Sequence, residues 1–336
     1  MSFALPPSMG SDPPYIRAER QALGLPSVSQ HCTIAVEGAD LPTREFDRLC
    51  ARRSLLPSAV ERSLHPRPFP RTDRNTATPV VMRNATFVSS AEYRARTTVR
   101  ALIAAVGDAN VTLSSSNSFS YGRRRMSVAQ YLTEALSPQA QAAWAAAARD
   151  DSAAAEMYYW FGEHGEELKA LTSSYPLPRY ATPGALLSVA MDAQVGATES
   201  ARPIEAPALS FGVGPDGSGV PFHFHGDGFS EVFHGAKLWL LYPHKPPRFR
   251  ENATAVRWLY HPFTSSPSAL HLRTSSLIST VPPLQVRWLY SDYYALTPAE
   301  RPLECLIGPG DLLYFPKGWW HAVVNVGETV FMSTFL

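Results

Sequence analysis

Short apolar runs separated by Gly- and Pro-containing turns follow one another along the chain from about Ser210 to its end. Runs of roughly four to eight residues bounded by such turns are typical of β-strands. The pattern predicts strands at residues 209–213, 221–225, 230–233, 237–242, 304–307, 312–315, 321–325 and 330–335. Many short strands of this kind predict a β-sandwich or a β-barrel.

Apolar positions at helical spacing mark the region ahead of these strands. They predict helices at residues 90–106, 127–136 and 140–157, with short strands at 79–82 and 111–115. Ser127 is placed to cap the second helix, and Ser137 followed by Pro138 is expected to end it.

Periodicity also divides the chain into an arm and a domain. Residues 1–78 are rich in Pro, Arg and Ser and, apart from a helix-like stretch at 41–53, lack a sustained pattern, so we expect a partly disordered arm. One domain follows over residues 79–336. Its first part, 79–208, mixes helices and strands, and its second part, 209–336, is the barrel core.

A five-residue repeat interrupts the barrel core. Val-Arg-Trp-Leu-Tyr occurs at residues 256–260 and again at 286–290. A single pair does not make a repeat architecture. We interpret residues 256–285 as a loop insertion or an error in the gene model, and we place no function there.

The composition is that of a globular protein, because 45% of the residues are hydrophobic and 18% are charged. No apolar run reaches the length that crosses a bilayer, so we expect no membrane span. The formal net charge of +1 gives no electrostatic reason to expect a nucleic acid partner. Cys32, Cys50 and Cys305 are spaced too widely for a zinc ribbon or a CxxC redox pair, and they allow one disulfide and one free thiol.

Two features bear on the cellular compartment. The segment that begins at Met1 lacks a basic region followed by an apolar stretch, so we expect no signal peptide in the chain as written. Yet Asn84, Asn110 and Asn252 each begin a glycosylation sequon, three among only six asparagines. The sequons indicate a luminal protein, and the cytoplasm is the alternative.

The most informative motif is His223-Phe224-His225, together with the distant His321. Side chains at i and i+2 of a strand share a face, so the first two imidazoles are expected to point the same way. With a third imidazole from another strand they form a donor set that suits iron or zinc. His225-Gly226-Asp227 places a carboxylate two residues further on, so Asp227 is an alternative ligand.

The order and spacing of several motifs over residues 209–336 resemble the JmjC (jumonji) cupin domain of the 2-oxoglutarate oxygenase superfamily. The motifs are Pro221-x-His223-x-His225, Gly235-x-Lys237-x-Trp239, Gly310-Asp311 and Trp319-Trp320-His321. The resemblance implies a mainly β fold with flanking helices, a double-stranded β-helix of the jelly-roll or cupin type. It also implies Fe(II) and 2-oxoglutarate as cofactors and a protein as substrate or partner.

The family's metal ligands map onto this chain with one departure. The resemblance makes His223 the first ligand and His321 the last. The residue two after the first histidine is normally Asp or Glu, and here it is His225. Three arrangements therefore stay open: three histidines, a set that includes Asp227, or no catalytic metal.

The resemblance also assigns the ligand pocket. Lys237 matches the lysine that pairs with the distal carboxylate of 2-oxoglutarate, for which an ammonium on an apolar wall has the right charge and reach. Tyr121 matches a phenol that donates to the same carboxylate. Ser230 and Asn325 match polar pocket positions, although each fits a satisfied polar group of the core equally well.

Further runs resemble a small stand-alone JmjC subfamily of the endoplasmic reticulum lumen. They include Gly228-Phe229-Ser230-Glu231-Val232 and Arg301-Pro302-Leu303-Glu304-Cys305. Cys32 and Cys305 coincide with cysteines of that subfamily, so in an oxidising compartment a bridge between them is implied.

These implications lead to an Fe(II)/2-oxoglutarate-dependent oxygenase of the protein hydroxylase type, with an altered His-x-His and distal His site. The histidine at position 225 motivates the alternative, a catalytically inactive JmjC-fold binding or regulatory protein of the secretory pathway. A third hypothesis is a three-histidine dioxygenase that does not use 2-oxoglutarate. Lys237 argues against it, because such an enzyme needs no lysine to anchor 2-oxoglutarate. The sequence names neither the substrate nor the oligomeric state.

Overall fold

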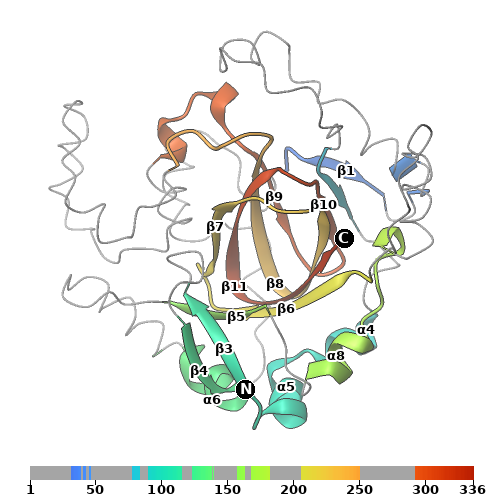
Figure 1. Ribbon diagram of the computed structural model, residues 1–336, viewed down its shortest axis with the longest axis vertical. Coiled ribbons are helices and arrows are strands. Elements are labelled where there is room, and N and C mark those ends of the chain that lie inside the picture. Colours follow the sequence, from blue (N-terminus) through green and yellow to red (C-terminus); the bar gives the residue numbers. More distant parts are fainter. Residues whose placement is uncertain are drawn as a thin grey trace, which may run out of the picture.

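Most strands of this computed structural model curl into a barrel, with the α-helices of residues 91–173 gathered at one end (Figure 1). It describes residues 32–38, 41–42, 45–46, 78–83, 90–115, 123–137, 139, 157–162, 168–181, 206–249 and 292–336. Within these parts the strands form an eleven-stranded sheet in the order β1-β2-β10-β8-β11-β6-β5-β3-β4, with β7 paired to β11 and β9 paired to β8. The predicted mainly β fold with flanking helices is confirmed.

The elements are bounded as follows. The strands are β1 (Ala35–Glu37), β2 (Val80–Met82), β3 (Asn110–Ser115), β4 (Arg123–Ser127), β5 (Tyr158–Phe161), β6 (Ala208–Gly214), β7 (Gly219–His223), β8 (Gly228–Tyr242), β9 (Leu303–Ile307), β10 (Leu312–Phe315) and β11 (Trp320–Phe335). The helices are α4 (Ala91–Arg96), α5 (Val99–Val106), α6 (Val128–Gln130), the π-helix η2 (Tyr131–Ala135), α8 (Lys169–Ser173) and the short 3-10 helices η4 (Arg179–Ala181), η5 (Tyr293–Ala295) and η6 (Pro298–Glu300).

Two long strands, β8 and β11, pair antiparallel along most of their length and lie next to each other in the middle of the sheet. Each joins two strands that the sequence predicts separately, 230–233 and 237–242 in β8 and 321–325 and 330–335 in β11. Both glycines have positive φ, 74° and 71°, and the register between the two strands shifts near them. A side chain at Gly235 would collide with the Glu328 carbonyl. The glycines therefore bend two continuous strands instead of ending them.

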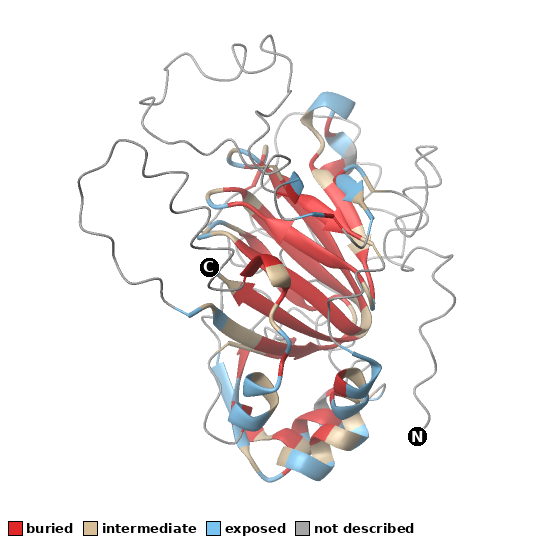
Figure 2. Cartoon of the chain, turned by 90° about the vertical axis from the view of Figure 1, so that its right-hand side faces the viewer, coloured by how far each residue is buried: buried red, intermediate tan, exposed pale blue. Residues whose placement is uncertain are grey.

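Strand alternation divides the buried side chains between the two faces of the barrel wall. On β8, Trp239 and Leu241 belong to the cluster inside the barrel, whereas Leu238 and Leu240 belong to a cluster on the outer face. Figure 2 shows the central strands of the barrel buried along most of their length, with exposed residues on helices, turns and edge strands such as β1 and β4. Because successive side chains of a strand point to opposite faces, every second residue lines the interior of the barrel and the residues between them point outward.

Two of the predicted helical regions, 90–106 and 127–136, are confirmed as helical, with a division in the first. Residues 90–106 form α4 and α5, not a single helix, because Thr97 closes the first and the Thr98 side chain accepts from the Ala101 N–H to cap the second. At the start of the second predicted helix, the Ser127 side chain accepts from the Gln130 N–H, as expected. That helix continues as the π-helix η2, which ends at Ala135.

Three predictions concern residues that the structure describes in small part or not at all. The insertion at 256–285 lies outside the described residues, as do nearly all of the helices expected at 41–53 and 140–157.

Within the predicted arm, β1 pairs in parallel with β2, and Cys32 forms the implied disulfide with Cys305 of β9. None of the described helices is both long and apolar enough to cross a membrane.

Candidate metal and ligand site

Two paired strands and one loop bring the three motif histidines together. His223 ends β7 and lies opposite His321 of β11 in the antiparallel ladder. His225 lies beyond the end of β7, where its carbonyl accepts from the Gly318 N–H at 2.9 Å. The predicted strand 221–225 thus stops early, yet the three imidazoles still converge, with one ligand atom of each within 4.8 Å of the others.

Backbone carbonyls fix the tautomer of every imidazole in this cluster. Nδ1 of His223 lies 2.8 Å from the Pro221 carbonyl, Nδ1 of His225 lies 2.7 Å from that of Gly226, and Nδ1 of His321 lies 2.9 Å from that of Trp319. A carbonyl only accepts, so each Nδ1 must donate. Each Nε2 therefore keeps its lone pair, which is the arrangement found around metal-ligating histidines.

The distance between two of these Nε2 atoms fits a shared ion. His321 Nε2 lies 3.1 Å from His225 Nε2, and two unprotonated nitrogens cannot hydrogen-bond to each other. Two nitrogens bound at right angles to one ion, each at about 2.1 Å, lie about 3.0 Å apart. The donor set therefore fits a divalent metal with imidazole ligands on one face.

Burial keeps the three imidazoles neutral. It lowers the pKa of His223 to about 4 and that of His321 well below its usual value. The pKa of His225 is also lowered, chiefly by burial, and the Gly226 carbonyl and the Asp227 carboxylate offset part of this effect. Neutral imidazole is the form that binds a metal.

Lys237 lines the same cavity and is only 3% exposed. Its Nζ lies 3.0 Å from the centre of the Phe331 ring, and burial lowers its pKa well below the usual value. Among the described residues no carboxylate pairs with this ammonium. A buried cation without an anionic partner is costly, so the cavity is suited to a ligand that brings negative charge.

The polar positions expected near Lys237 fall in different places. Asn325 is fully buried and lines the cavity; its Nδ2 donates to Ser218 Oγ at 2.9 Å, and within the described part of the chain its Oδ1 has no partner. Ser230 is also fully buried, and its Oγ lacks a partner among the same residues. It pairs with Ser333 across the sheet, and Ser333, not Ser230, lines the cavity.

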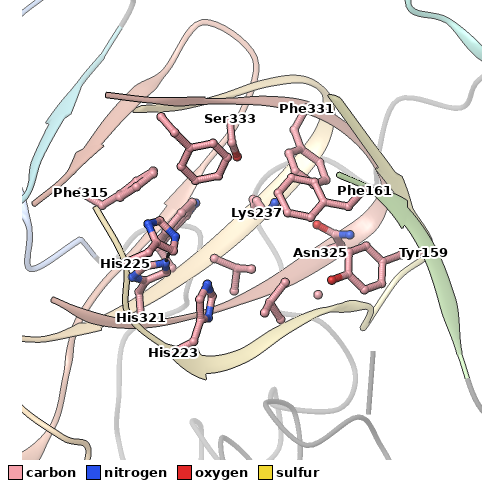
Figure 3. A pocket seen from close by; sticks show the side chains of 15 residues that line it. Tyr159, Phe161, His223, His225, Lys237, Phe315, His321, Asn325, Phe331 and Ser333 are labelled. Carbon is pink, nitrogen blue, oxygen red and sulfur yellow. Dashed lines mark hydrogen bonds between the residues drawn. The ribbon is translucent and has the colours of Figure 1, made fainter. Parts of the chain in front are cut away.

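The cavity walls are mostly aromatic and aliphatic. Figure 3 shows the three imidazoles on one side, Asn325 and Tyr159 on the other, and Lys237 between them. Besides the residues already named, the lining consists of Phe161, Gly219, Val220, Trp239, Phe315, Val323, Phe331 and Phe335. The Trp239 and Phe315 rings lie 5.5 and 5.3 Å from the His321 ring. Such walls strengthen polar interactions inside by excluding water.

Sequence reasoning missed the role of β5. Tyr159 and Phe161 face the cavity. Trp160, between them, packs in a further core cluster that is formed largely with residues of the helices. The alternation of a strand produces this division. The aromatic run was noticeable in the sequence, but nothing in it indicated which face would meet the histidines.

Two further candidate residues lie away from the cluster or outside the described chain. Asp227 is not a member of the convergent group; its carboxylate accepts from the Tyr314 hydroxyl and lies near Lys317. Burial raises the pKa of Asp227, and those neighbours partly offset the rise. Tyr121 lies outside the described residues.

Comparisons with known proteins agree with this geometry. A family model described as a cupin-like domain matches residues 66–335. The human JmjC domain-containing protein 8 is 33% identical over 260 residues, which are 77% of this chain and 75% of that protein.

Weaker similarity over about a third of the chain extends to other proteins. The Caenorhabditis briggsae bifunctional arginine demethylase and lysyl-hydroxylase psr-1 is 30% identical over 37% of this chain and 28% of its own length. The Danio rerio 2-oxoglutarate and iron-dependent oxygenase JMJD4 is 29% identical over 35% of this chain and 24% of its own length.

Proposed function

This chain belongs to the cupin-like JmjC domain family, and from that membership we propose that it is an Fe(II)- and 2-oxoglutarate-dependent oxygenase acting on protein. One observation carries the proposal. Three imidazole acceptors converge in the same apolar cavity as a buried ammonium that has no anionic partner among the described residues. A metal fits the first group, and a carboxylate fits the second.

Each chain residue has a distinct task in this proposal. The Nε2 atoms of His223, His225 and His321 hold the metal, and their Nδ1–H groups, bonded to carbonyls, keep the rings oriented. Lys237 binds the distal carboxylate of 2-oxoglutarate, and Asn325 Oδ1 is available to a donor on a bound ligand or water. When bound, Fe(II) supplies the chemistry that couples decarboxylation of 2-oxoglutarate to succinate with hydroxylation of a C–H bond by dioxygen.

Protein is the proposed substrate class, and the endoplasmic reticulum lumen is the proposed compartment. The name of the psr-1 relative describes action on arginine and lysine side chains, which supports a protein substrate. The Cys32–Cys305 disulfide supports an oxidising compartment. Asn110, which begins a sequon, is exposed and is thereby accessible for glycosylation.

His225 favours a second candidate function. A neutral imidazole in place of the family's carboxylate leaves a bound Fe(II) with less negative charge and weakens its retention. In that case the barrel is a binding or regulatory protein without turnover. The change His225→Asp separates the two: it raises Fe(II) affinity and 2-oxoglutarate turnover in an inactive barrel, and it damages an enzyme built on three histidines.

The direct test is an anaerobic titration of Fe(II)-loaded protein with 2-oxoglutarate. Wild-type protein should develop the weak visible charge-transfer absorption of the chelate. Lys237→Met should require far more 2-oxoglutarate, whereas Lys169→Met, which removes an exposed lysine from α8, should match wild type. If wild-type protein gives no band at saturating Fe(II) and 2-oxoglutarate, the oxygenase proposal fails.

A further inference from the structure

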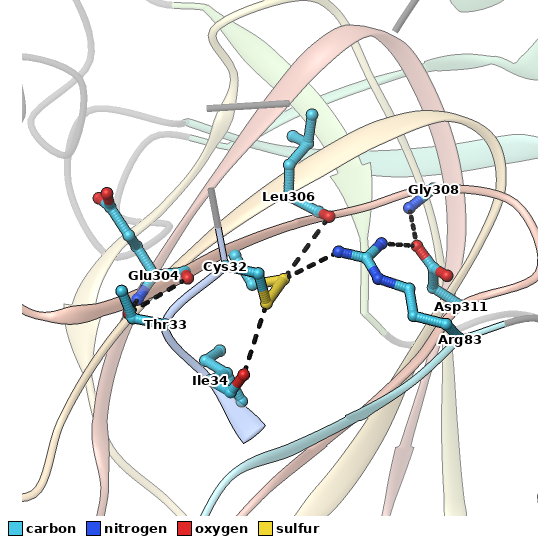
Figure 4. Close-up of a disulfide and its surroundings, with 9 residues drawn as sticks. Cys32, Thr33, Ile34, Arg83, Glu304, Leu306, Gly308 and Asp311 are labelled. Carbon is cyan, nitrogen blue, oxygen red and sulfur yellow. Dashed lines mark hydrogen bonds and ion pairs between the residues drawn. A yellow bond between two sulfur atoms is a disulfide. The ribbon is translucent and has the colours of Figure 1, made fainter. Parts of the chain in front are cut away.

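The disulfide fastens the start of the described chain to the barrel. Cys32 lies directly opposite Cys305 of β9 in an antiparallel bridge, with the two Cα atoms 4.2 Å apart. Thr33 strengthens the crossing: its N–H donates to the Glu304 carbonyl, and its hydroxyl accepts from the Glu304 N–H, both at 2.8 Å (Figure 4). The proposed oxygenase chemistry makes no use of this bond.

Arg83 places a positive charge directly against one of the two sulfurs. Its Nη2 donates to Cys305 Sγ at 3.2 Å, while its Nη1 forms an ion pair with Asp311. Asp311 is held in turn by the Gly308 N–H at 2.9 Å. The guanidinium is therefore fixed in place, and Figure 4 shows it between the sulfur and the carboxylate.

This contact strengthens when the disulfide opens. A disulfide sulfur is a weak acceptor, but a thiolate carries a full negative charge and forms a strong charge-assisted hydrogen bond with a guanidinium. An arginine beside a cysteine lowers the pKa of its thiol, and a thiol of lower pKa leaves faster in exchange. Arg83 thus favours the opened state over the closed one at Cys305 specifically.

The two sulfurs also differ in access. Cys305 is fully buried, whereas Cys32 is only partly buried. An incoming thiolate therefore reaches Cys32, and the buried Cys305 beside Arg83 is the leaving group. We propose that Cys32–Cys305 is a thiol–disulfide exchange site at which a dithiol releases the Cys32 segment from β9.

The exchange is balanced as follows. A thiolate of the dithiol bonds to Cys32 Sγ while the Cys32–Cys305 bond breaks, and the bonding pair leaves on Cys305 Sγ. The second thiolate of the dithiol then displaces Cys32, which takes a proton. The dithiol ends as a disulfide, two electrons have reached the protein, and Cys305 stays a thiolate against the guanidinium.

Without the disulfide, the described part of this segment is held by the three-residue β1 ladder to β2, by the two Thr33–Glu304 hydrogen bonds, and by the buried side chains of Ile34, Leu41 and Phe46. The ladder is short, and β1 itself is largely exposed. Reduction should therefore raise hydrogen exchange in residues 33–37 before it affects the rest of the barrel. This rise in hydrogen exchange is expected at the N-terminal edge of the molecule and does not depend on metal binding.

The test follows reduction of the full chain by dithiothreitol under native conditions, with acid quench, alkylation and mass analysis of the Cys32 and Cys305 peptides. Arg83→Gln should slow reduction on the order of tenfold and lower the reduced fraction in a fixed dithiothreitol redox mixture. Arg83→Lys, which keeps the charge, should recover most of the rate. Arg100→Gln, which removes an exposed charge on α5, should match wild type.

Glutathione, a monothiol, identifies the sulfur that is attacked. The trapped mixed disulfide should be on Cys32, and hydrogen exchange should rise in residues 33–37 of the reduced protein. The proposal is overturned if Arg83→Gln reacts at the wild-type rate or faster, if Arg83→Lys is as slow as Arg83→Gln, or if glutathione is found on Cys305. It is equally overturned if wild-type protein is reduced only as fast as it unfolds globally.

Discussion

Lys237→Met should stabilise the protein without ligand and remove its response to 2-oxoglutarate. The lysine is buried in the cavity, and its Nζ contacts the Phe331 ring 3.0 Å away. Methionine retains most of the apolar volume of the stem but carries no charge. Higher stability without ligand together with loss of the ligand response is expected only where the protein keeps a buried charge in order to bind that ligand.

The size of the stabilisation follows from two competing terms. A buried ion costs several kcal/mol in lost hydration, and a desolvated cation over an aromatic ring recovers about 2 kcal/mol. Replacing buried charges with apolar side chains typically stabilises by about 1–4 kcal/mol. With about 2.1 cal/mol/K of unfolding entropy per residue over a domain of roughly 260 residues, a value of about 2 kcal/mol raises Tm by about 4 °C.

The gain should depend on pH in a defined direction. Burial lowers the pKa of Lys237 in the folded state from 10.5, its value in the unfolded chain. The unfolded state therefore binds more protons between the two values, and wild-type stability rises as pH rises through that window. The advantage of Lys237→Met is full below the folded pKa and narrows as pH approaches 10.5.

The assay is a thermal melt of wild type, Lys237→Met and Lys169→Met, each with and without Fe(II) and 2-oxoglutarate under anaerobic conditions. At a ligand concentration of about 100 times Kd, wild-type protein should gain about 2.7 kcal/mol. Lys237→Met should begin higher and gain little, and Lys169→Met should follow wild type. A lower Tm for Lys237→Met without ligand, or an unchanged gain with ligand, would refute the assignment.

Further predictions concern the cross-link, a helix cap, a buried hydrogen bond and the metal. Cys32→Ser should lower the unfolding free energy of oxidised protein by about 5 kcal/mol, because the loop spans 273 residues, and dithiothreitol should bring wild type to the same denaturant midpoint. Thr98→Ala should cost about 1 kcal/mol in the same titration through loss of the α5 cap. Tyr175→Phe should cost about 1–3 kcal/mol, because it removes the 2.8 Å hydrogen bond to the buried Glu231 carboxylate. In equilibrium dialysis, 2-oxoglutarate should raise Fe(II) affinity on the order of tenfold in wild type and not in Lys237→Met.

Local pattern was sufficient to predict most of the barrel and the core of the candidate site. Strand alternation predicted that His223 and His225 would share a face, and the resemblance to the JmjC domain added His321 and Lys237; all four line the same cavity. Side-chain capping was equally local: Ser127 begins its helix as expected, because the signal lies within three residues of the cap.

The remainder depends on contacts between distant segments. The sequence predicts separate strands on the two sides of Gly235, and the close approach of the Glu328 carbonyl, which leaves no room for a side chain there, comes from a distant segment. Tyr159 reaches the cavity because β5 pairs with β6 at the edge of the barrel. Arg83 meets Cys305 across 222 residues, and no spacing rule connects the two.

The charge balance in the cavity explains how histidine at position 225, where the family has an acidic residue, bears on both proposed functions. Three neutral imidazoles leave a divalent ion uncompensated, and the Lys237 ammonium adds a further positive charge nearby. An acidic residue at position 225 would offset part of this charge, but His225 offsets none. A dicarboxylate that contacts both the ion and Lys237 therefore supplies the missing negative charge, so each must raise the affinity for the other by the same factor. Under the proposed function, the barrel should hold a metal firmly only while the 2-oxo acid is bound, so that metal occupancy follows the supply of that ligand.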